Sequence, residues 1–447
     1  MILALCLAIL AVAVAMSYGE ASSHWRADWL SVPVIVAVVM VFGYVGPAYD
    51  VSRQIDLFFL RYPAGVHTLQ SATEQALALA LLAAISFAVG WYLPGRASSA
   101  PAYTIRWRPS ALVLFGLVYT VLGLALFTIG VMVLGGPAAV LGALGDRIRL
   151  TQGLNYLFQA TMLLVVVSIV WFTWLLTTGR SIRSVAFWTY TVAAFAVSAL
   201  QGSKSILFVF VLTLALLYHR LRARIRGSLA VLGGAISFVA LTAYALFARE
   251  YLAVGQLVSL SGWDLSSLLN ALRVEFVGNF IQLQTMIVLV GRVPHELSYQ
   301  LGRTYLATLT MPVPRGLWPD KPLPSTGVFT LAFWPDTWLV GGTTLPPGLF
   351  GEFYLNFGWI GVAIGAFAFA RVGRRLLARH VAAPLDPTRV LVYALFVAMT
   401  AHYVRGDFAV TVALLELLLP TLVLLTFCTR RVPRALPHPA RTDRSDA

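Results

Sequence analysis

Long apolar runs separated by short polar connections dominate this chain. A transmembrane helix needs about 20 mostly apolar residues to cross a hydrocarbon core of ~30 Å. The pattern predicts eleven such spans. The first run could be a signal segment, but it has neither a basic leading region nor a clear cleavage site. The predicted spans lie near residues 1–16, 30–46, 75–93, 111–134, 157–178, 185–200, 205–218, 229–248, 346–370, 390–404 and 408–428.

The composition agrees with a membrane protein, since 59% of the 447 residues are hydrophobic and 11% are charged. An ordinary soluble globular domain is excluded. We predict an all-α, polytopic membrane helix bundle of about 11 or 12 spans with one long extracytoplasmic loop. The domains are an N-terminal bundle of about eight spans (1–248), the long loop (249–345), the C-terminal spans (346–428) and a Pro- and Arg-rich tail predicted to be disordered (429–447).

The distribution of positive charge predicts the orientation. Of the 32 Lys and Arg residues, 20 lie in alternate connections, beginning with 17–29 and ending with the tail. Cytoplasmic loops carry such an excess, so the C-terminus is predicted to be cytoplasmic and the long loop extracytoplasmic. The formal net charge of +14 therefore indicates membrane topology and attraction to anionic lipid, and not nucleic-acid binding.

Within the long loop, residues 271–291 are apolar enough to suggest a twelfth span, but that crossing would place the basic segment 371–389 outside. We predict an amphipathic helix at the outer interface instead. Its apolar face would carry Phe276, Phe280, Leu283 and Ile287, and its polar stripe Glu275, Asn279 and Gln282. The polar stripe could line a groove or simply face water.

Cationic side chains recur in the segments predicted to be extracytoplasmic. Ionisable groups at span ends are costly unless they are paired or hydrated, and a planar guanidinium suits phosphate because it donates in pairs. Gly202, Ser203 and Lys204 could form a small anion nest. These groups form either an anion site or a set of helix-end side chains that reach water. The candidates are Arg147, Arg149, Lys204, Arg315, Lys321 and Arg405.

The stretch MPVPRGLWPDKP at 311–322 cannot be a span, because each proline removes a backbone donor. Its mixture of Arg315, Trp318, Asp320 and Lys321 suits an anionic or sugar-bearing ligand at a membrane face.

Two carboxylates at or within spans also stand out. Glu352 near the start of a span is either a residue favoured by the helix dipole or a general base in a low-dielectric pocket. Glu416, inside the last span, is either functional or bonded to a neighbouring helix.

No metal or cofactor is expected. Cys6 and Cys428 lie far apart in apolar helices, and the chain has no GKS/T, HExxH or CxxC motif.

Short motifs in this chain resemble those of the Wzy-type O-antigen and polysaccharide repeat-unit polymerases. The resemblance rests on PRGLWPDKP at 314–322, GEFYLNFGWIGV at 351–362 and GSKS at 202–205, where family members often carry Gly-Ser-Arg. The arginines at 147 and 149 and the Arg405-Gly406-Asp407 sequence also fit. The family is thought to resemble multi-span glycosyltransferases with lipid-linked donors (GT-C-like).

The resemblance implies an inverting glycosyltransferase at the outer face of the bacterial cytoplasmic membrane. It would join oligosaccharide repeats carried on undecaprenyl pyrophosphate, with a chain-length regulator and a flippase as possible partners. A sugar hydroxyl would attack the anomeric carbon while lipid pyrophosphate leaves. The implied base is Glu352, Asp320 or Asp407, in falling order. The six cations would bind pyrophosphate, and Trp318 would stack on a sugar or anchor the interface.

Two other functions stay open. An O-antigen ligase would use the same donor with a different acceptor. A transporter or flippase of lipid-linked sugars would place polar residues along several spans, whereas Glu416 is almost alone in mid-span.

Overall fold

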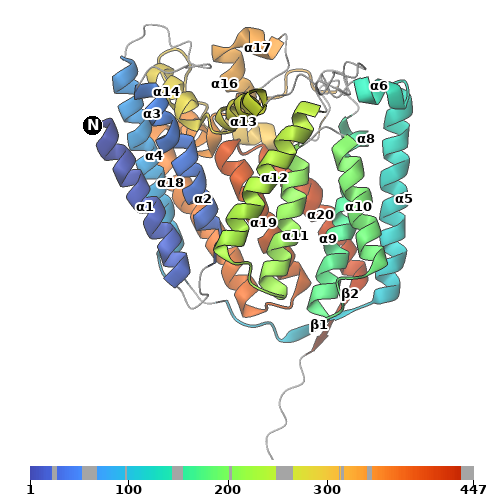
Figure 1. Cartoon of the computed structure of the whole chain (residues 1–447). Helices are drawn as coiled ribbons and strands as arrows, with labels where there is room; N and C mark the ends of the chain where they lie inside the picture. Colours follow the sequence, from blue (N-terminus) through green and yellow to red (C-terminus); the bar gives the residue numbers. More distant parts are fainter. Residues whose placement is uncertain are drawn as a thin grey trace, which may run out of the picture.

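Long helices run side by side between two ends of the molecule, and short helices gather at one of these ends (Figure 1). The computed structural model describes residues 1–22, 28–52, 68–95, 98–142, 155–200, 204–247, 265–311, 313, 317–339 and 345–433. The long elements are α1 (Ile2–Ser22), α2 (Val32–Met40) with the π-helical turn η1 (Val41–Val45) and α3 (Gly46–Ser52), α4 (Leu69–Tyr92), α5 (Pro109–Val133), α9 (Met162–Thr177), α10 (Val185–Leu200), α11 (Lys204–Leu221), α12 (Gly227–Phe247), α18 (Gly348–Ala382), α19 (Pro387–Arg405) and α20 (Val410–Cys428).

Eight helices in the described part of the chain are long and apolar enough to cross a membrane, so the protein is a multi-pass membrane protein. Two shorter apolar helices, Val185–Ala199 and Ser205–Leu221, lie beside them. Most of these helices begin and end within a few residues of the predicted spans. The first candidate span, Ile2–Gly19, is a helix of the bundle that packs on α2 and α4. The count of eleven spans stays a prediction.

Prolines and capping side chains set where several of these helices begin. Pro33, Pro109 and Pro387 occupy the first turn of α2, α5 and α19, where a missing N–H costs no helical hydrogen bond. Asp386 caps α19 by accepting hydrogen bonds from the N–H groups of Thr388 and Arg389. These residues fix the helix starts to within a few positions of the apolar runs.

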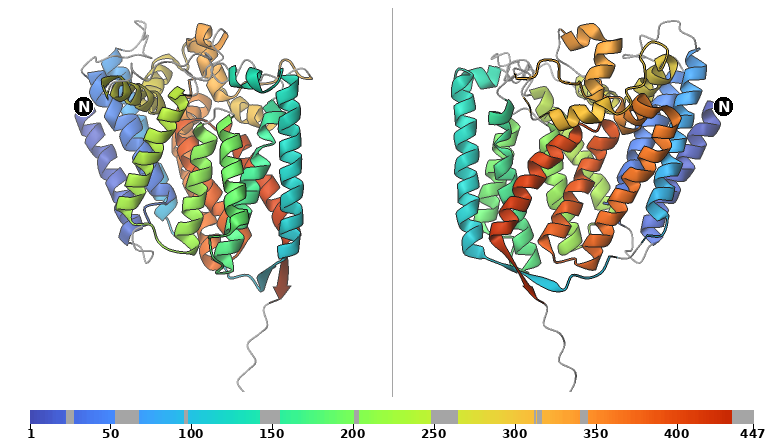
Figure 2. Two further views of the ribbon diagram at one scale, coloured as in Figure 1. Left: turned by 45° about the vertical axis from the view of Figure 1, so that its right-hand side comes forward. Right: turned by 180° about the vertical axis from the view of Figure 1, so that it is seen from behind.

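The two ends of the bundle differ (Figure 2). One, the loop end, carries the short helices α6 (Pro137–Gly142), α13 (Leu265–Asn279), α14 (Gln282–Arg292), α15 (Arg303–Thr310), α16 (Ser325–Phe333) and α17 (Pro335–Leu339), with α8 (Asn155–Gln159) leading into α9. The other, the ribbon end, carries strands β1 (Tyr103–Trp107) and β2 (Thr429–Pro433). The loop end holds the described parts of the segments predicted to be extracytoplasmic. Which end faces the cytoplasm stays a prediction.

The ribbon at 103–107 and 429–433 was not predicted. Strand β1 pairs antiparallel with β2, so that the segment before α5 is tied to the segment after α20. Residues 429–433 had been included in a tail predicted to be disordered, and for them this prediction was wrong. The backbone N–H and C=O groups of two distant segments satisfy one another here, and no local pattern reveals such pairing.

The single amphipathic helix predicted over 271–291 is two helices. Helix α13 ends at Asn279 and α14 begins at Gln282. Residues 282–291 are all buried, so α14 packs at the loop end against α4 and α18 and leaves no apolar face for lipid. Phe276 and Phe280 contact Phe42 of η1, with ring centroids 5.5 and 5.7 Å away. The predicted apolar face therefore packs on protein.

Candidate functional site

A kink in α18 organises the loop end. Phe357 and Gly358 leave helical geometry, and Gly358 has φ 62° and ψ −149°, a conformation open essentially to glycine alone. The interruption frees the backbone carbonyls of Leu355 and Asn356. These accept hydrogen bonds from the N–H groups of Gln300 and Leu301, at 2.9 and 3.2 Å. The kink thereby attaches the segment before α15 to the first turns of α18.

Glu352 lies at the centre of this junction and is 1% exposed. Its Oε1 accepts a hydrogen bond of 2.5 Å from the Thr304 hydroxyl on α15. Its Oε2 accepts one of 2.5 Å from the N–H of Phe408, in the turn between α19 and α20. Asn356, one turn further along α18, donates to the Thr304 oxygen at 2.8 Å. One carboxylate therefore connects three separate elements.

Asp407 makes a matching set of contacts and is 4% exposed. Its Oδ2 accepts hydrogen bonds of 3.1 Å from the Ser325 hydroxyl and the Thr326 N–H, at the start of α16. Its Oδ1 accepts one of 3.1 Å from the N–H of Ala409. Burial raises the pKa of Asp407, although the hydrogen bonds from Thr326 and Ser325 oppose the shift.

The two carboxylates interact with each other, and the Ser325 hydroxyl also approaches Glu352. Among the described residues neither carboxylate has an ion-pair partner, and their hydrogen-bond donors are hydroxyl and backbone N–H groups. Two adjacent buried carboxylates cannot both ionise at low cost without a cation. The lack of a described cation therefore favours the neutral form of Asp407, in line with its raised pKa.

Tyr305 packs against the same junction from α15. Its ring contacts Phe408 edge-on, with centroids 5.2 Å apart. Burial, and then the charge of Glu352, raise the pKa of Tyr305. The Tyr305 ring therefore bounds the site on the side of α15.

Two of the predicted cations form hydrogen bonds within the protein. The Lys321 ammonium donates to the carbonyls of Met311 and Val313 at 3.2 and 2.6 Å, beyond the last turn of α15. Arg405 donates through Nη1 to the Asn279 side chain, and its carbonyl accepts from Gln282 at 3.4 Å. Lys321 thus fixes the proline-rich loop to α15, and Arg405 fixes α19 to the α13–α14 junction.

Lys204 is the first residue of α11, and α11 packs on α19. The His402 ring on α19 contacts the Ser205 backbone, and it lies 6.4 Å from the Phe208 ring. The start of α11 and the end of α19, which carries Arg405, therefore meet at the loop end. Three further predicted cations, Arg147, Arg149 and Arg315, lie outside the described residues.

The remaining predicted residues differ in exposure. Asp320 is exposed on the loop beside Lys321, and Trp318 is 43% exposed. Glu416 is half-buried in α20, and no hydrogen bond or ion pair joins it to another described residue. Asp320 is thus the one of the three candidate bases that solvent or a ligand could reach directly.

Sequence reasoning missed the polar partners of this junction. Asn356 lies four residues after Glu352 within the 351–362 motif, and this spacing puts both side chains on one face of a helix. Thr304 and Ser325 come from other elements, and neither carries a local signal. The described residues hold no group of three or more His, Cys, Asp or Glu side chains that could bind a metal ion.

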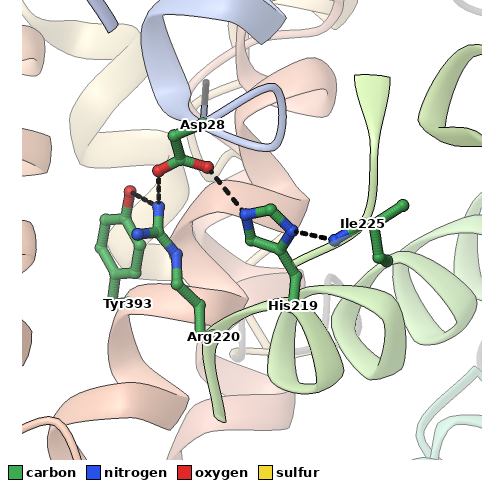
Figure 3. Close-up of polar contacts among 5 residues, drawn as sticks. All are labelled: Asp28, His219, Arg220, Ile225 and Tyr393. Atoms are coloured by element: carbon green, nitrogen blue, oxygen red, sulfur yellow. Dashed lines mark hydrogen bonds and ion pairs between the residues drawn. The ribbon is translucent and has the colours of Figure 1, made fainter. Parts of the chain in front are cut away.

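Another buried carboxylate, Asp28, was also missed; it lies shortly before α2, at the ribbon end, and contacts residues of α11 (Figure 1 and Figure 3). Its oxygens contact Arg220 and, at 3.1 Å, Nε2 of His219. The Ile225 N–H donates to Nδ1 of His219 at 2.9 Å, so the ring proton lies on Nε2 and is donated to Asp28. Arg220 also donates to the Tyr393 hydroxyl at 3.1 Å. Arg220, the first arginine of the basic run at 220–226, therefore ties elements together inside the protein.

Fold and site together define a multi-pass, all-α membrane protein whose loop end contains a buried carboxylate pair. Comparison with protein-family models, curated proteins and solved structures gave no match to this chain. The resemblance to repeat-unit polymerases therefore rests on the motifs in the chain itself.

Proposed function

We propose that this protein polymerises oligosaccharide repeats carried on undecaprenyl pyrophosphate, as an inverting glycosyltransferase. One observation carries the proposal: motif segments far apart in sequence converge at the loop end. Glu352, from the GEFYLNFGWIGV motif, accepts a hydrogen bond from Phe408, directly after Arg405-Gly406-Asp407. The Lys204 segment meets the same end of α19, and Lys321 fixes the proline-rich loop beside α15.

The chemistry requires a base for the attacking hydroxyl and cations for the leaving group. The hydroxyl oxygen bonds to the anomeric carbon, the bond from that carbon to the pyrophosphate oxygen breaks, and the hydroxyl proton passes to the base. Cations at the pyrophosphate stabilise charge that develops in the transition state. Lys204 and Arg405, with Arg147, Arg149 and Arg315, are the proposed contacts, while Lys321 shapes the loop.

The geometry favours Asp320 as the base, because its carboxylate is exposed on the proline-rich loop. Both oxygens of Glu352 accept hydrogen bonds from within the chain, and the side chain is 1% exposed. Glu352 and Asp407 are therefore proposed as positioning residues. Trp318 is 43% exposed and lies two residues before Asp320, and it is proposed to stack on a sugar.

The proposal also includes the finer topology. Eleven spans, a GT-C-like arrangement, a loop end outside the bacterial cytoplasmic membrane and a cytoplasmic C-terminus would together place the site where lipid-linked repeats are presented. The proposed partners are the lipid-linked repeat, a chain-length regulator and a flippase.

The test is complementation of a deletion strain, read as polysaccharide chain length. Lys204→Ala and Arg315→Ala are expected to leave single capped repeats, a loss of polymer of at least a hundredfold, while the protein still inserts. Arg273→Ala, at an exposed arginine on α13 at the same end, is the matched control and should leave the polymer unchanged.

Other outcomes identify the rival functions. Normal chain lengths in both the Lys204 and Arg315 variants would refute the pyrophosphate contacts. Polymer that accumulates on the lipid carrier in the deletion strain would indicate a ligase. Repeats trapped inside the cell would indicate a flippase.

A further inference from the structure

The β1–β2 ribbon places like charges directly opposite each other. In its register Arg106 pairs with Arg430, and both are exposed. Side chains directly opposite on an antiparallel pair lie about 4.5–5.5 Å apart at Cβ, and like charges there are destabilising. Two arginines at such a pair are therefore unfavourable unless an anion lies between them.

A third arginine extends the same face. The Arg108 N–H donates to the Cys428 carbonyl at 2.7 Å, so the ladder continues beyond β1. Because side chains alternate along a strand, Arg108 lies on the face of Arg106. The side chains of Arg106, Arg108 and Arg430 form no hydrogen bond or ion pair with another described residue. We call these three residues the arginine ladder.

Through Arg106, the ladder adjoins a cavity of about 810 Å³ between β1, the end of α9 and the α18–α19 turn. Arg106 and Arg180 both line this cavity, and the Arg180 guanidinium lies 4.9 Å from the centre of the Trp174 ring. The Trp107 indole donates to Thr177 at 3.0 Å, which holds β1 against α9. The cavity is thus a fixed structure with cations at its wall.

The acidic residue in the cavity lining, Asp386, does not neutralise these arginines. Its Oδ1 accepts hydrogen bonds from the N–H groups of Thr388 and Arg389, at 3.0 and 3.3 Å. Its Oδ2 lies 3.7 Å from the Arg389 side chain. The carboxylate is used as the cap of α19, and the positive charge of Arg106 and Arg180 is left for a ligand.

The position of the ribbon indicates which anion fits. Figures 1 and 2 show it at the end of the helix bundle, where α5 begins and α20 ends. Both are candidate membrane spans, so the ribbon lies at the depth where a bilayer presents its headgroups. Trp107 and Trp174 at the same level suit this interface. Guanidinium groups bind phosphate oxygens through paired hydrogen bonds.

We propose that the arginine ladder and the adjoining cavity bind the phosphate headgroup of an anionic phospholipid. The phosphate bridges β1 and β2 and relieves the repulsion between Arg106 and Arg430. The bound lipid thereby holds the α4–α5 connection to the segment after α20.

The test compares two variants of the full chain that lose the same charge. Arg106→Gln/Arg430→Gln removes the ladder pair. Arg222→Gln/Arg226→Gln removes two exposed arginines from the connection between α11 and α12 at the same end. Phosphatidylglycerol or phosphatidylcholine is titrated into the purified protein in uncharged detergent, and the melting temperature is recorded. General attraction to anionic lipid falls equally in both variants, so a difference between them reports the site.

Phosphatidylglycerol is expected to stabilise the wild type, with an apparent affinity about tenfold weaker in the ladder variant than in the control. In phosphatidylcholine the ladder variant should melt no lower than the wild type, because the repulsion is gone. If the double variant does not fold, Arg430→Gln alone should show an intermediate loss. Equal affinities in the ladder and control variants would overturn the proposal. Equal stabilisation of the wild type by inorganic phosphate would do so too, because the ligand would then be a free anion.

Discussion

Two buried carboxylate sites, one at each end of the molecule, are built on opposite principles. At the ribbon end Asp28 contacts a guanidinium and an imidazole, so its negative charge is compensated inside the protein. At the loop end Glu352 and Asp407 accept hydrogen bonds from hydroxyl and backbone groups, and no described cation pairs with either. The first site balances charge, whereas the second places two buried carboxyl groups side by side without a described cation.

The difference separates a structural role from one linked to protons. A compensated ion pair stays charged and ties elements together, here the start of α2 with α11 and α19. A buried carboxyl group without a compensating cation has a raised pKa, as Asp407 has, and shifted pKa values recur at functional sites. The contrast therefore supports the loop end as the place of chemistry and the ribbon end as a structural tie.

The largest expected effect is the removal of the compensating cation at the ribbon end. Arg220→Met should lower the free energy of unfolding by about 3–5 kcal/mol, because Asp28 would stay buried without its partner. The measurement is thermal unfolding of the purified chain in nanodiscs of one lipid composition. Arg222→Met, at an exposed arginine two positions further on, is the control and should change stability by less than about 0.5 kcal/mol. Equal melting temperatures for the Arg220 variant and this control would mean that Arg220 does not compensate the buried charge of Asp28.

Neutralisation of a carboxylate at the loop end should cost less. Glu352→Gln keeps one acceptor oxygen and loses the other, a cost of about 1 kcal/mol, and it also removes a charge from beside Asp407. Polymer should still form, with shortened chains, because Glu352 positions the turn at Phe408 and is not the proposed base. Asp320→Asn should abolish polymer while stability is unchanged. A folded Glu352 variant that makes no polymer, together with an active Asp320 variant, would reverse the two assignments.

The sequence predicted the positions of the long apolar helices, since their apolar runs are local and some of their ends carry prolines and caps such as Pro387 and Asp386. It also singled out Glu352, because a carboxylate beside an apolar segment is conspicuous, whereas Asp407 was named only through the resemblance to a family. The sequence could not predict the hydroxyl groups that donate to these carboxylates. Thr304 and Ser325 belong to other elements, which the α18 kink and the position of α16 bring beside them. Asp28 looked like an ordinary loop residue until the fold placed Arg220 beside it. The ribbon was missed for the same reason, since each strand is recognisable only beside the other.

The smallest expected effect is a difference in pH dependence, and its sign distinguishes the two sites. Burial raises the pKa of Asp407 in the folded state, so its contribution to stability is fully present below the unfolded pKa of about 3.9 and is lost as pH rises through the folded pKa.

Asp28 should behave in the opposite way. Burial raises its pKa, but the hydrogen bond from His219 and the charge of Arg220 outweigh that and lower the pKa overall. Its contribution is present above about pH 3.9 and is lost as pH falls through the folded pKa.

In nanodiscs between pH 4 and 8, Asp407→Asn should therefore weaken the loss of stability that the wild type shows on alkalinisation. Below pH 4, Asp28→Asn should weaken the loss that the wild type shows on acidification. Stability profiles that both variants alter in the same direction would mean that the two sites do not differ in compensation, and the contrast between the ends of the molecule would fail.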